Sequence, residues 1–237
     1  LNIPLFIEKP ISNNLKDCWE FKNLVKAKKS LVLVGYVLRH SQILNQFRKI
    51  IENNLIGKHL YVEIKYSSYL PEWRKNSNYK TTVSSNYSLG GGALLELSHE
   101  LDYANWLFGP FINFHSLNAN SKELDINVED MVKIIAINSK NCLIDIHLDF
   151  CYKGLERYCN IYGSKGLLRL DFIKGEIITK LHSEGKPKKL KIFEKYDDMY
   201  INQMQHFFNC IESDTVPMVN IEEATEIIKI IEKCKEK

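Results

Sequence analysis

The chain has 237 residues, of which 45% are hydrophobic and 26% are charged. This composition is typical of soluble globular proteins, and the length suffices for one large domain or two small ones. The formal net charge of +3 is small and dispersed, which argues against nucleic acid as a partner. No apolar run reaches the ~18 residues that a membrane span needs, so no membrane association is expected.

The six cysteines include no C-x-x-C pair, and the seven histidines show no H-x-x-x-H or H-E-x-x-H spacing. We therefore expect free thiols in a reducing, cytoplasmic compartment, without a disulfide framework and without a metal site. No signal peptide is visible, but the chain begins with Leu1 and not with methionine, so this start does not define the natural N-terminus.

The first elements in chain order predict two parallel strands joined by a helix. Residues 3–8 form a short apolar run, and residues 31–37 form a second one. Between them, residues 12–14 offer helix N-caps, and apolar residues follow at roughly helical spacing up to Lys28. This order is typical of a right-handed β-α-β unit.

A helix is predicted from about Ser41, a strand over residues 60–68, and a polar, irregular segment over residues 71–89 that is long enough to be functional. Three glycines at 90–92 then lead into a helix that runs to about Leu107 and stops at Gly109 and Pro110. The remaining pattern predicts an antiparallel sheet followed by two amphipathic helices. The strands are 132–138, 143–150, 156–162, 167–172, 176–181 and 189–193, and the helices are 199–211 and 221–234.

The strand over residues 143–150 has the clearest period of two. Its apolar members face one way and its polar members the other: Ile144, Ile146, Leu148 and Phe150 against Asp145, His147 and Asp149. The polar face is compatible with either a solvated surface or a polar interface.

Lys9 lies in the segment Glu8-Lys9-Pro10, directly after the first strand. The carboxyl ends of parallel strands are where open α/β sheets bind ligands. A lysine there can stabilise a developing alkoxide or, with its pKa lowered by burial, accept a hydroxyl proton. The alternative is an exposed lysine beside a proline turn.

His99 lies on the predicted helix after the three glycines. Glu96, His99 and either Asp102 or Tyr103 recur at i, i+3 and i+6 or i+7, so one helix face carries a carboxylate, an imidazole and a second polar group. Imidazole is the commonest general acid or base, and a neighbouring carboxylate can orient it. The alternative is a half-exposed polar face with an incidental histidine.

Together these segments, with residues 34–39 (VGYVLR) and 69–74 (YLPEWR), resemble the glucose–fructose oxidoreductase / inositol dehydrogenase (Gfo/Idh/MocA) family. The resemblance covers essentially the whole chain. It implies an α/β and α+β protein: residues 1–38 as the remnant of a doubly wound Rossmann sheet, and residues 39–237 as an α+β domain with a large, mostly antiparallel open sheet.

The resemblance also implies roles for particular residues. Lys9 and His99 would be catalytic, handling the substrate's hydroxyl proton. Glu8, Lys9, Pro10 and Arg39 would bind the cofactor, and Trp73, Arg74, Glu96, Asp102 and Tyr103 would bind the substrate. Two positions depart from the family pattern: Glu96 stands three residues before the histidine where an aspartate commonly stands four before, and His40 is out of register by one.

The implied function is an oxidoreductase that uses NAD or NADP and acts on a carbinol of a sugar, cyclitol or nucleotide-linked sugar, as a homo-oligomer (dimer or tetramer) built through the outer sheet face. The chain, however, contains no G-x-G-x-x-G, and the family pattern implies about 80–90 further residues upstream of the remnant. The alternative function is therefore a truncated, non-catalytic protein whose open sheet serves oligomerisation or partner binding.

Overall fold

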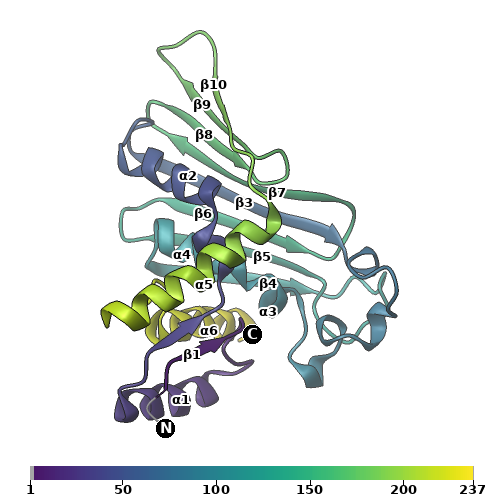
Figure 1. The fold of residues 1–237 in the computed structure, drawn as a ribbon. Helices are drawn as coiled ribbons and strands as arrows, with labels where there is room; N and C mark the ends of the chain where they lie inside the picture. Colours follow the sequence, from purple (N-terminus) through teal and green to yellow (C-terminus); the bar gives the residue numbers. More distant parts are fainter. Residues whose placement is uncertain (1–2, 237) are drawn as a thin grey trace. The chain divides into compact units, whose positions relative to one another are not determined.

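The computed structural model describes residues 3–236. The chain divides into two compact units: unit 1 contains the chain up to Gln42 and from Glu194 onward, and unit 2 contains Ile43–Phe193. This division differs from the boundary predicted after residue 38, because the two C-terminal helices belong to the same unit as the first strands. Figure 1 traces the elements along the chain.

Unit 1 contains a parallel pair of strands, β1 (Leu5–Ile7) and β2 (Val32–Val34), joined by helix α1 (Leu15–Lys28). The Asn14 side chain caps α1 by accepting a 2.9 Å hydrogen bond from the Asp17 amide. The predicted β-α-β order is confirmed. The apolar stripe expected on α1 is only partly buried, because Val25 is inside whereas Trp19 is 52% exposed.

The C-terminal helices α5 (Tyr196–Ser213) and α6 (Ile221–Lys235) complete unit 1, with the 3-10 turn η1 (Val37–His40) packed against α5. Asn220 caps α6 by accepting from the Glu223 amide. The Val34 amide donates a 2.9 Å hydrogen bond to the Val219 carbonyl. The chain before α6 therefore binds the edge of β2 that β1 leaves open.

Unit 2 is built on an eight-stranded sheet with the order β10-β9-β8-β7-β3-β6-β5-β4. The parallel pair β3–β6 lies inside an otherwise antiparallel sheet, as predicted for a large, mostly antiparallel sheet. The predictions did not include β4, the strand that directly follows the helix ending near Phe108. It is an exposed strand at the edge of the sheet. The strands are β3 (His59–Tyr69), β4 (Phe111–Ala119), β5 (Met131–Asn138), β6 (Leu143–Asp149), β7 (Cys151–Gly163), β8 (Gly166–Asp171), β9 (Glu176–Leu181) and β10 (Lys188–Lys191).

One face of this sheet forms the core of unit 2, together with helices α2 (Gln42–Glu52), α3 (Ala93–Glu96) and α4 (Ser98–Phe108). The alternation predicted over residues 143–150 is confirmed for its inward-facing apolar side chains, because Ile144, Ile146 and Leu148 of β6 and the following Phe150 are fully buried. The 71–89 segment is a series of 3-10 turns: η2 (Leu70–Glu72), η3 (Tyr79–Thr81), η4 (Val83–Ser85) and η5 (Tyr87–Leu89).

The prediction of a single helix after the three glycines is wrong in one respect, because the helix is broken at Leu97. This residue has φ −95° and ψ 21°, and it separates the short α3 from α4. Glu96 and His99 therefore lie on two helical segments, and the i, i+3 spacing does not by itself place them on one face. None of the helices within residues 3–236 is long and apolar enough to cross a membrane.

Candidate active site

In unit 1, Lys9 follows the carboxyl end of β1. The Gly35 amide donates a 2.7 Å hydrogen bond to the Ile7 carbonyl, which extends the β1–β2 pairing by one residue. A Cβ atom at position 35 would lie 3.2 Å from Glu8 Oε2, so a glycine suits this close approach. Lys9 and Pro10 are half-buried and Glu8 is exposed.

Arg39 is 1% exposed, and its guanidinium forms an ion pair with Glu223 of α6. The same Nη1 atom also donates a hydrogen bond of 3.5 Å to the Met218 carbonyl oxygen. These contacts join η1 to the start of α6 within unit 1. A contact of Arg39 with a cofactor stays a prediction.

His40, which the sequence did not favour as a ligand, is buried against His206 of α5, with 5.1 Å between the ring centroids. Burial, followed by the nearby His206 and Arg39, lowers the pKa of His40 to about 4. His206 accepts a 2.9 Å hydrogen bond from the Met218 amide, and burial lowers its pKa as well. Both imidazoles are therefore neutral at pH 7.

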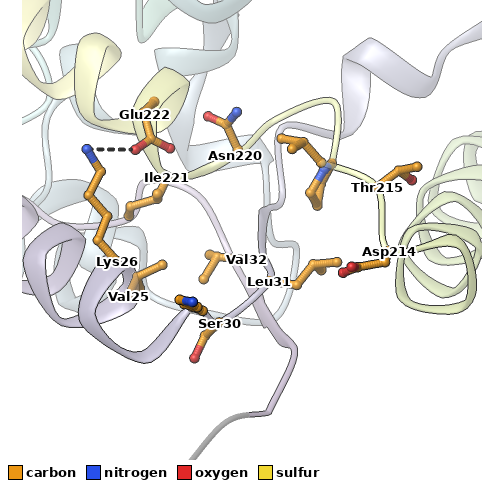
Figure 2. Close-up of a pocket in the computed structure, with 13 residues that line it drawn as sticks. Val25, Lys26, Ser30, Leu31, Val32, Asp214, Thr215, Asn220, Ile221 and Glu222 are labelled. Atoms are coloured by element: carbon orange, nitrogen blue, oxygen red, sulfur yellow. Dashed lines mark ion pairs between the residues drawn. The ribbon is translucent and has the colours of Figure 1, made fainter.

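A pocket of about 270 Å³ in unit 1 lies between the end of α1, the start of β2 and the start of α6 (Figure 2). Its rim carries the Lys26–Glu222 ion pair at 3.4 Å. Because β1 and β2 are parallel and Leu5 pairs with Val32, this pocket lies at the opposite strand ends from Lys9. None of the predicted site residues lines it.

In unit 2, His99 is half-buried in the first turn of α4. One residue before the Leu97 break, Glu96 Oε2 accepts a 2.9 Å hydrogen bond from Ser84 Oγ in the 71–89 segment. Glu96 is thus held by this segment, whether or not it also contacts a substrate. The sequence analysis missed Ser84, because no local pattern pairs a loop serine with a helix carboxylate.

The three glycines permit a close approach to Glu129. Gly92 has φ +109°, and a Cβ atom there would lie 2.4 Å from Glu129 Oε1. The Glu129 carboxylate accepts a 3.1 Å hydrogen bond from the Leu94 amide, and the backbone carbonyl of Glu129 accepts one from the Ala93 amide. Glu129 therefore satisfies amides at the start of α3 from the segment before β5. The sequence analysis missed this residue too.

Next to His99, Glu100 is fully buried and pairs with Arg157 Nη2 of β7 at 2.5 Å. Burial raises the pKa of the Glu100 carboxyl, and Arg157 opposes the rise. Neither residue was a predicted site residue. No local pattern pairs a helix glutamate with an arginine 57 positions later in the chain.

Asp102 and Tyr103, predicted to touch substrate, have no exposed surface. The Tyr103 ring lies 5.7 Å from the Phe172 ring, and burial followed by the Glu100 charge raises the pKa of its hydroxyl well above the usual value. Their substrate contacts stay predictions.

Trp73 Nε1 donates a 2.8 Å hydrogen bond to Ser68 Oγ, and its ring packs edge-on against Phe150 at 5.2 Å. Trp73 therefore anchors the start of the 71–89 segment to the sheet. Arg74, next to it, is exposed. The substrate-binding roles predicted for both residues stay predictions.

The described residues do not provide a cradle for the pyrophosphate of a dinucleotide. Such a cradle is a glycine-rich turn between a strand and the N-terminus of a helix. In residues 3–236 the strand-to-helix turn of the parallel unit is formed by residues 8–14, which contain no glycine. All six cysteines lie in the described range and carry free thiols.

The open sheet covered by helices on its core face and the parallel β-α-β unit define a mixed α/β protein. Residues 48–237 match the family described as "Oxidoreductase family, C-terminal alpha/beta domain", and the chain belongs to this Gfo/Idh/MocA family.

Among curated proteins, the chain is similar to inositol 2-dehydrogenase of Salmonella paratyphi B, with 20% identity over 90% of this chain and 61% of the relative. It is also similar to inositol 2-dehydrogenase/D-chiro-inositol 3-dehydrogenase of Lactiplantibacillus plantarum, with 21% identity over 90% of this chain and 59% of the relative. The chain thus spans about three fifths of the length of these relatives.

Solved structures show the same fold. A levoglucosan dehydrogenase in complex with NADH and levoglucosan superposes with a TM-score of 0.87 at 16% identity, over 98% of this chain and 70% of that one. An inositol dehydrogenase homolog from Azotobacter vinelandii, in complex with NADH and myo-inositol, gives a TM-score of 0.78 at 14% identity, over 97% and 68% of the two chains.

Proposed function

We propose that this chain supplies the substrate side of an NAD(P)-dependent oxidoreductase, which transfers a hydride between nicotinamide and a carbinol carbon of a sugar, a cyclitol or a nucleotide-linked sugar. The family match over residues 48–237 carries the proposal. The relatives named inositol 2-dehydrogenase, and the similar folds solved with NADH and a sugar or cyclitol, support this substrate class.

His99 is the proposed acid/base. When hydride leaves a carbinol carbon, the hydroxyl proton must move to a base, and a neutral imidazole is suited to accept it near pH 7. The half-burial of His99 on the first turn of a helix supports this role, because part of the residue stays exposed to solvent or ligand.

Lys9 is proposed to stabilise the developing alkoxide with its ammonium group. Its place at the carboxyl end of β1 supports a ligand-facing role. Glu8 and Pro10 would line the nicotinamide-binding surface, and Arg39 of η1 would contribute to cofactor binding. Trp73, Arg74, Glu96, Asp102 and Tyr103 complete the proposed substrate contacts.

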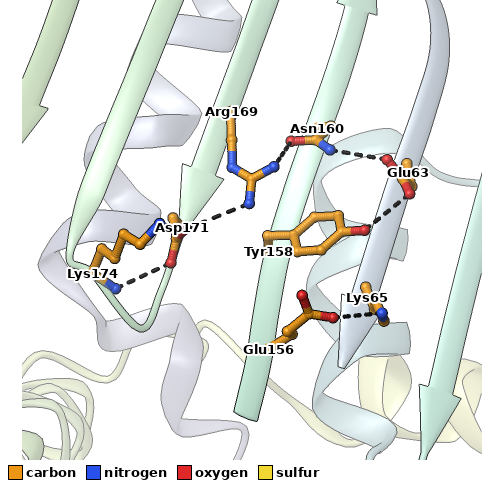
Figure 3. A network of polar contacts seen from close by, with 8 residues as sticks. All are labelled: Glu63, Lys65, Glu156, Tyr158, Asn160, Arg169, Asp171 and Lys174. Atoms are coloured by element: carbon orange, nitrogen blue, oxygen red, sulfur yellow. Dashed lines mark hydrogen bonds and ion pairs between the residues drawn. The ribbon is translucent and has the colours of Figure 1, made fainter. Parts of the chain in front are cut away.

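A homo-oligomer, built through the outer face of the eight-stranded sheet, is part of the proposal. On one half of this face, paired polar groups cross from strand to strand: Tyr158 Oη donates to Glu63, Asn160 bridges Glu63 and Arg169, and Lys65 pairs with Glu156 (Figure 3). On the other half, where Leu143 pairs with Ile137 and with Tyr61, apolar side chains are 39–40% exposed, namely Ile137, Leu143 and Tyr162. An apolar patch beside satisfied polar groups is the composition of a subunit interface.

The rival function is a non-catalytic protein that uses the same outer face for oligomerisation. The apolar side chains exposed on this face support it. Both functions place the protein in the cytoplasm, which the free thiols support.

The deciding experiment is a titration of the folded 237-residue chain with NADH and NADPH, followed by nicotinamide fluorescence, and then an assay of NAD(P) reduction with myo-inositol, levoglucosan and nucleotide-linked sugars. Saturable binding and turnover that His99→Ala abolishes would support the oxidoreductase. A folded oligomer that binds neither nucleotide would favour the rival for this chain, and the titration should then be repeated on the chain joined to an upstream dinucleotide-binding segment.

A further inference from the structure

The helix that carries His99 begins without a side-chain cap. The N-cap position of α4 is Leu97, whose side chain makes no capping hydrogen bond to the first turn. A helix N-terminus leaves four amides without partners inside the helix, so an uncapped end tends to fray. Because α3 ends at the same residue, the backbone is broken one residue before the turn that contains His99.

Glu100 ties this turn to the sheet. Its carboxylate is fully buried and accepts from Arg157 Nη2 of β7 at 2.5 Å. Arg157 is itself held from two sides, since its guanidinium lies 5.1 Å from the Tyr66 ring centroid and 5.2 Å from that of Phe172. Tyr66 is the cross-strand neighbour of Arg157 on β3, so the anchor extends across the centre of the sheet.

A buried ion pair is a costly way to stabilise a core, because both ions lose their hydration, and apolar residues of similar volume often stabilise a core as well or better. The pair also provides something that apolar contacts do not, which is a directional bond of fixed length. Here the bond fixes the side chain of the residue next to His99, whose amide donates a 3.0 Å hydrogen bond to the Leu97 carbonyl, at a helix start where the N-cap residue has no capping side chain.

We propose that Glu100 and Arg157 are positioning residues that fix the first turn of α4, and with it the His99 imidazole, relative to the sheet. The inference rests on the proposed acid/base role of His99 for its consequence in catalysis, but the structural part stands without it. Misplacing a reacting group by about 1 Å can cost on the order of 100-fold in rate.

The test uses the full 237-residue chain with two substitutions together, Glu100→Leu and Arg157→Met, which remove both charges and leave neither one unpaired. Hydrogen–deuterium exchange, followed by mass spectrometry, reports on the amides of residues 97–102. We expect these amides to exchange at least about tenfold faster than in the unsubstituted chain, while the amides of β3, β6 and α6 keep their protection. Unchanged exchange at 97–102 in the folded double variant would overturn the proposal.

Two further variants keep the test decisive. Glu52→Gln breaks the exposed Arg48–Glu52 pair of the same unit, at 2.8 Å, and should leave the exchange at 97–102 unchanged. Glu100→Asp keeps the charge and shortens the side chain, and it serves as the test if the double variant does not fold. This single variant should also speed amide exchange in the first turn of α4. An unchanged exchange rate there would refute the positioning role.

In a catalytically active preparation, the double variant should lower kcat by about 100-fold with little change in KM. Faster exchange at 97–102 without loss of kcat would support the positioning role of Glu100 and Arg157 but refute the acid/base role of His99. The two failures are therefore distinguishable.

Discussion

Ser84 Oγ donates a hydrogen bond of 2.9 Å to Glu96 Oε2, and this contact joins the 71–89 segment to α3 just before the helix breaks at Leu97. Ser84 is fully buried and Glu96 is half-buried. The loop and the helical segment next to His99 are therefore coupled by a bond to a charged group, which is stronger than a bond between neutral groups.

Replacing Ser84 with alanine should loosen this coupling. A hydrogen bond to a charged group contributes about 1.5–3 kcal/mol, so we expect kcat/KM of an active preparation to fall about tenfold or more. Ser88→Ala is the matched control, because the Ser88 hydroxyl binds Asn86 in the exposed part of the same segment. Equal kinetics for the two variants would contradict a role for the Ser84–Glu96 bond.

His99→Ala and Lys9→Ala should each lower turnover by about 100-fold or more in an active preparation, because each removes a group that handles the hydroxyl proton or the alkoxide. Circular dichroism should show an unchanged fold. His182→Ala and Lys186→Ala, both at exposed positions, are the controls and should retain turnover. Near-normal turnover in both site variants would refute the assigned roles.

Gly92→Ala should destabilise unit 2, because residue 92 has φ +109° and the added Cβ would meet the Glu129 carboxylate at 2.4 Å. A strained backbone and a steric clash together predict a loss of about 2–4 kcal/mol in the free energy of unfolding. Gly185→Ala is the control, because a Cβ there meets nothing within 4 Å. The measurement is urea unfolding of both variants, and equal midpoints would contradict the prediction.

Unit 1 should lose stability in mild acid. The pKa of His40 is lowered from 6.5 to about 4, mainly by burial, so the unfolded chain binds more protons than the folded one in this window. The stability that depends on neutral His40 should therefore be complete above pH 6.5. As the pH falls toward 4, the free energy of unfolding should decrease by about 2–3 kcal/mol from His40 alone. His206 contributes with the same sign, since its pKa is also lowered.

The measurement is urea unfolding between pH 7.5 and pH 4.5. His40→Gln removes the main titrating group, and its stability should depend less steeply on pH over this range. If the unsubstituted chain and the variant show the same slope, His40 is not the source of the acid sensitivity.

Ile137→Lys should dissociate the proposed oligomer, because it places a charge in the apolar half of the outer sheet face, where Ile137 pairs with Leu143. Sedimentation velocity should show a dimer or tetramer for the unsubstituted chain and a monomer for the variant. Val216→Lys is the control, because Val216 is 73% exposed but lies in unit 1. A monomeric unsubstituted chain would refute this interface.

The sequence by itself determined the features that depend on local patterns. The alternation over residues 143–150 predicted which side chains enter the core, and Ile144, Ile146, Leu148 and Phe150 are fully buried. Asn14 is the N-cap of α1 as residues 12–14 indicated. The Gly90–Gly92 segment was correctly placed before a helix. These predictions succeed because side-chain period and capping chemistry involve residues that are close in sequence.

The tertiary structure decided what depends on residues distant in the chain. It paired β3 with β6 in parallel inside an antiparallel sheet, added the edge strand β4, and returned α5 and α6 to the unit of the first strands. It also broke the helix at Leu97 and joined Glu100 to Arg157 across 57 positions of sequence. No local pattern specifies such contacts, because their free energy comes from burying charges and apolar surfaces that meet only when the chain has folded.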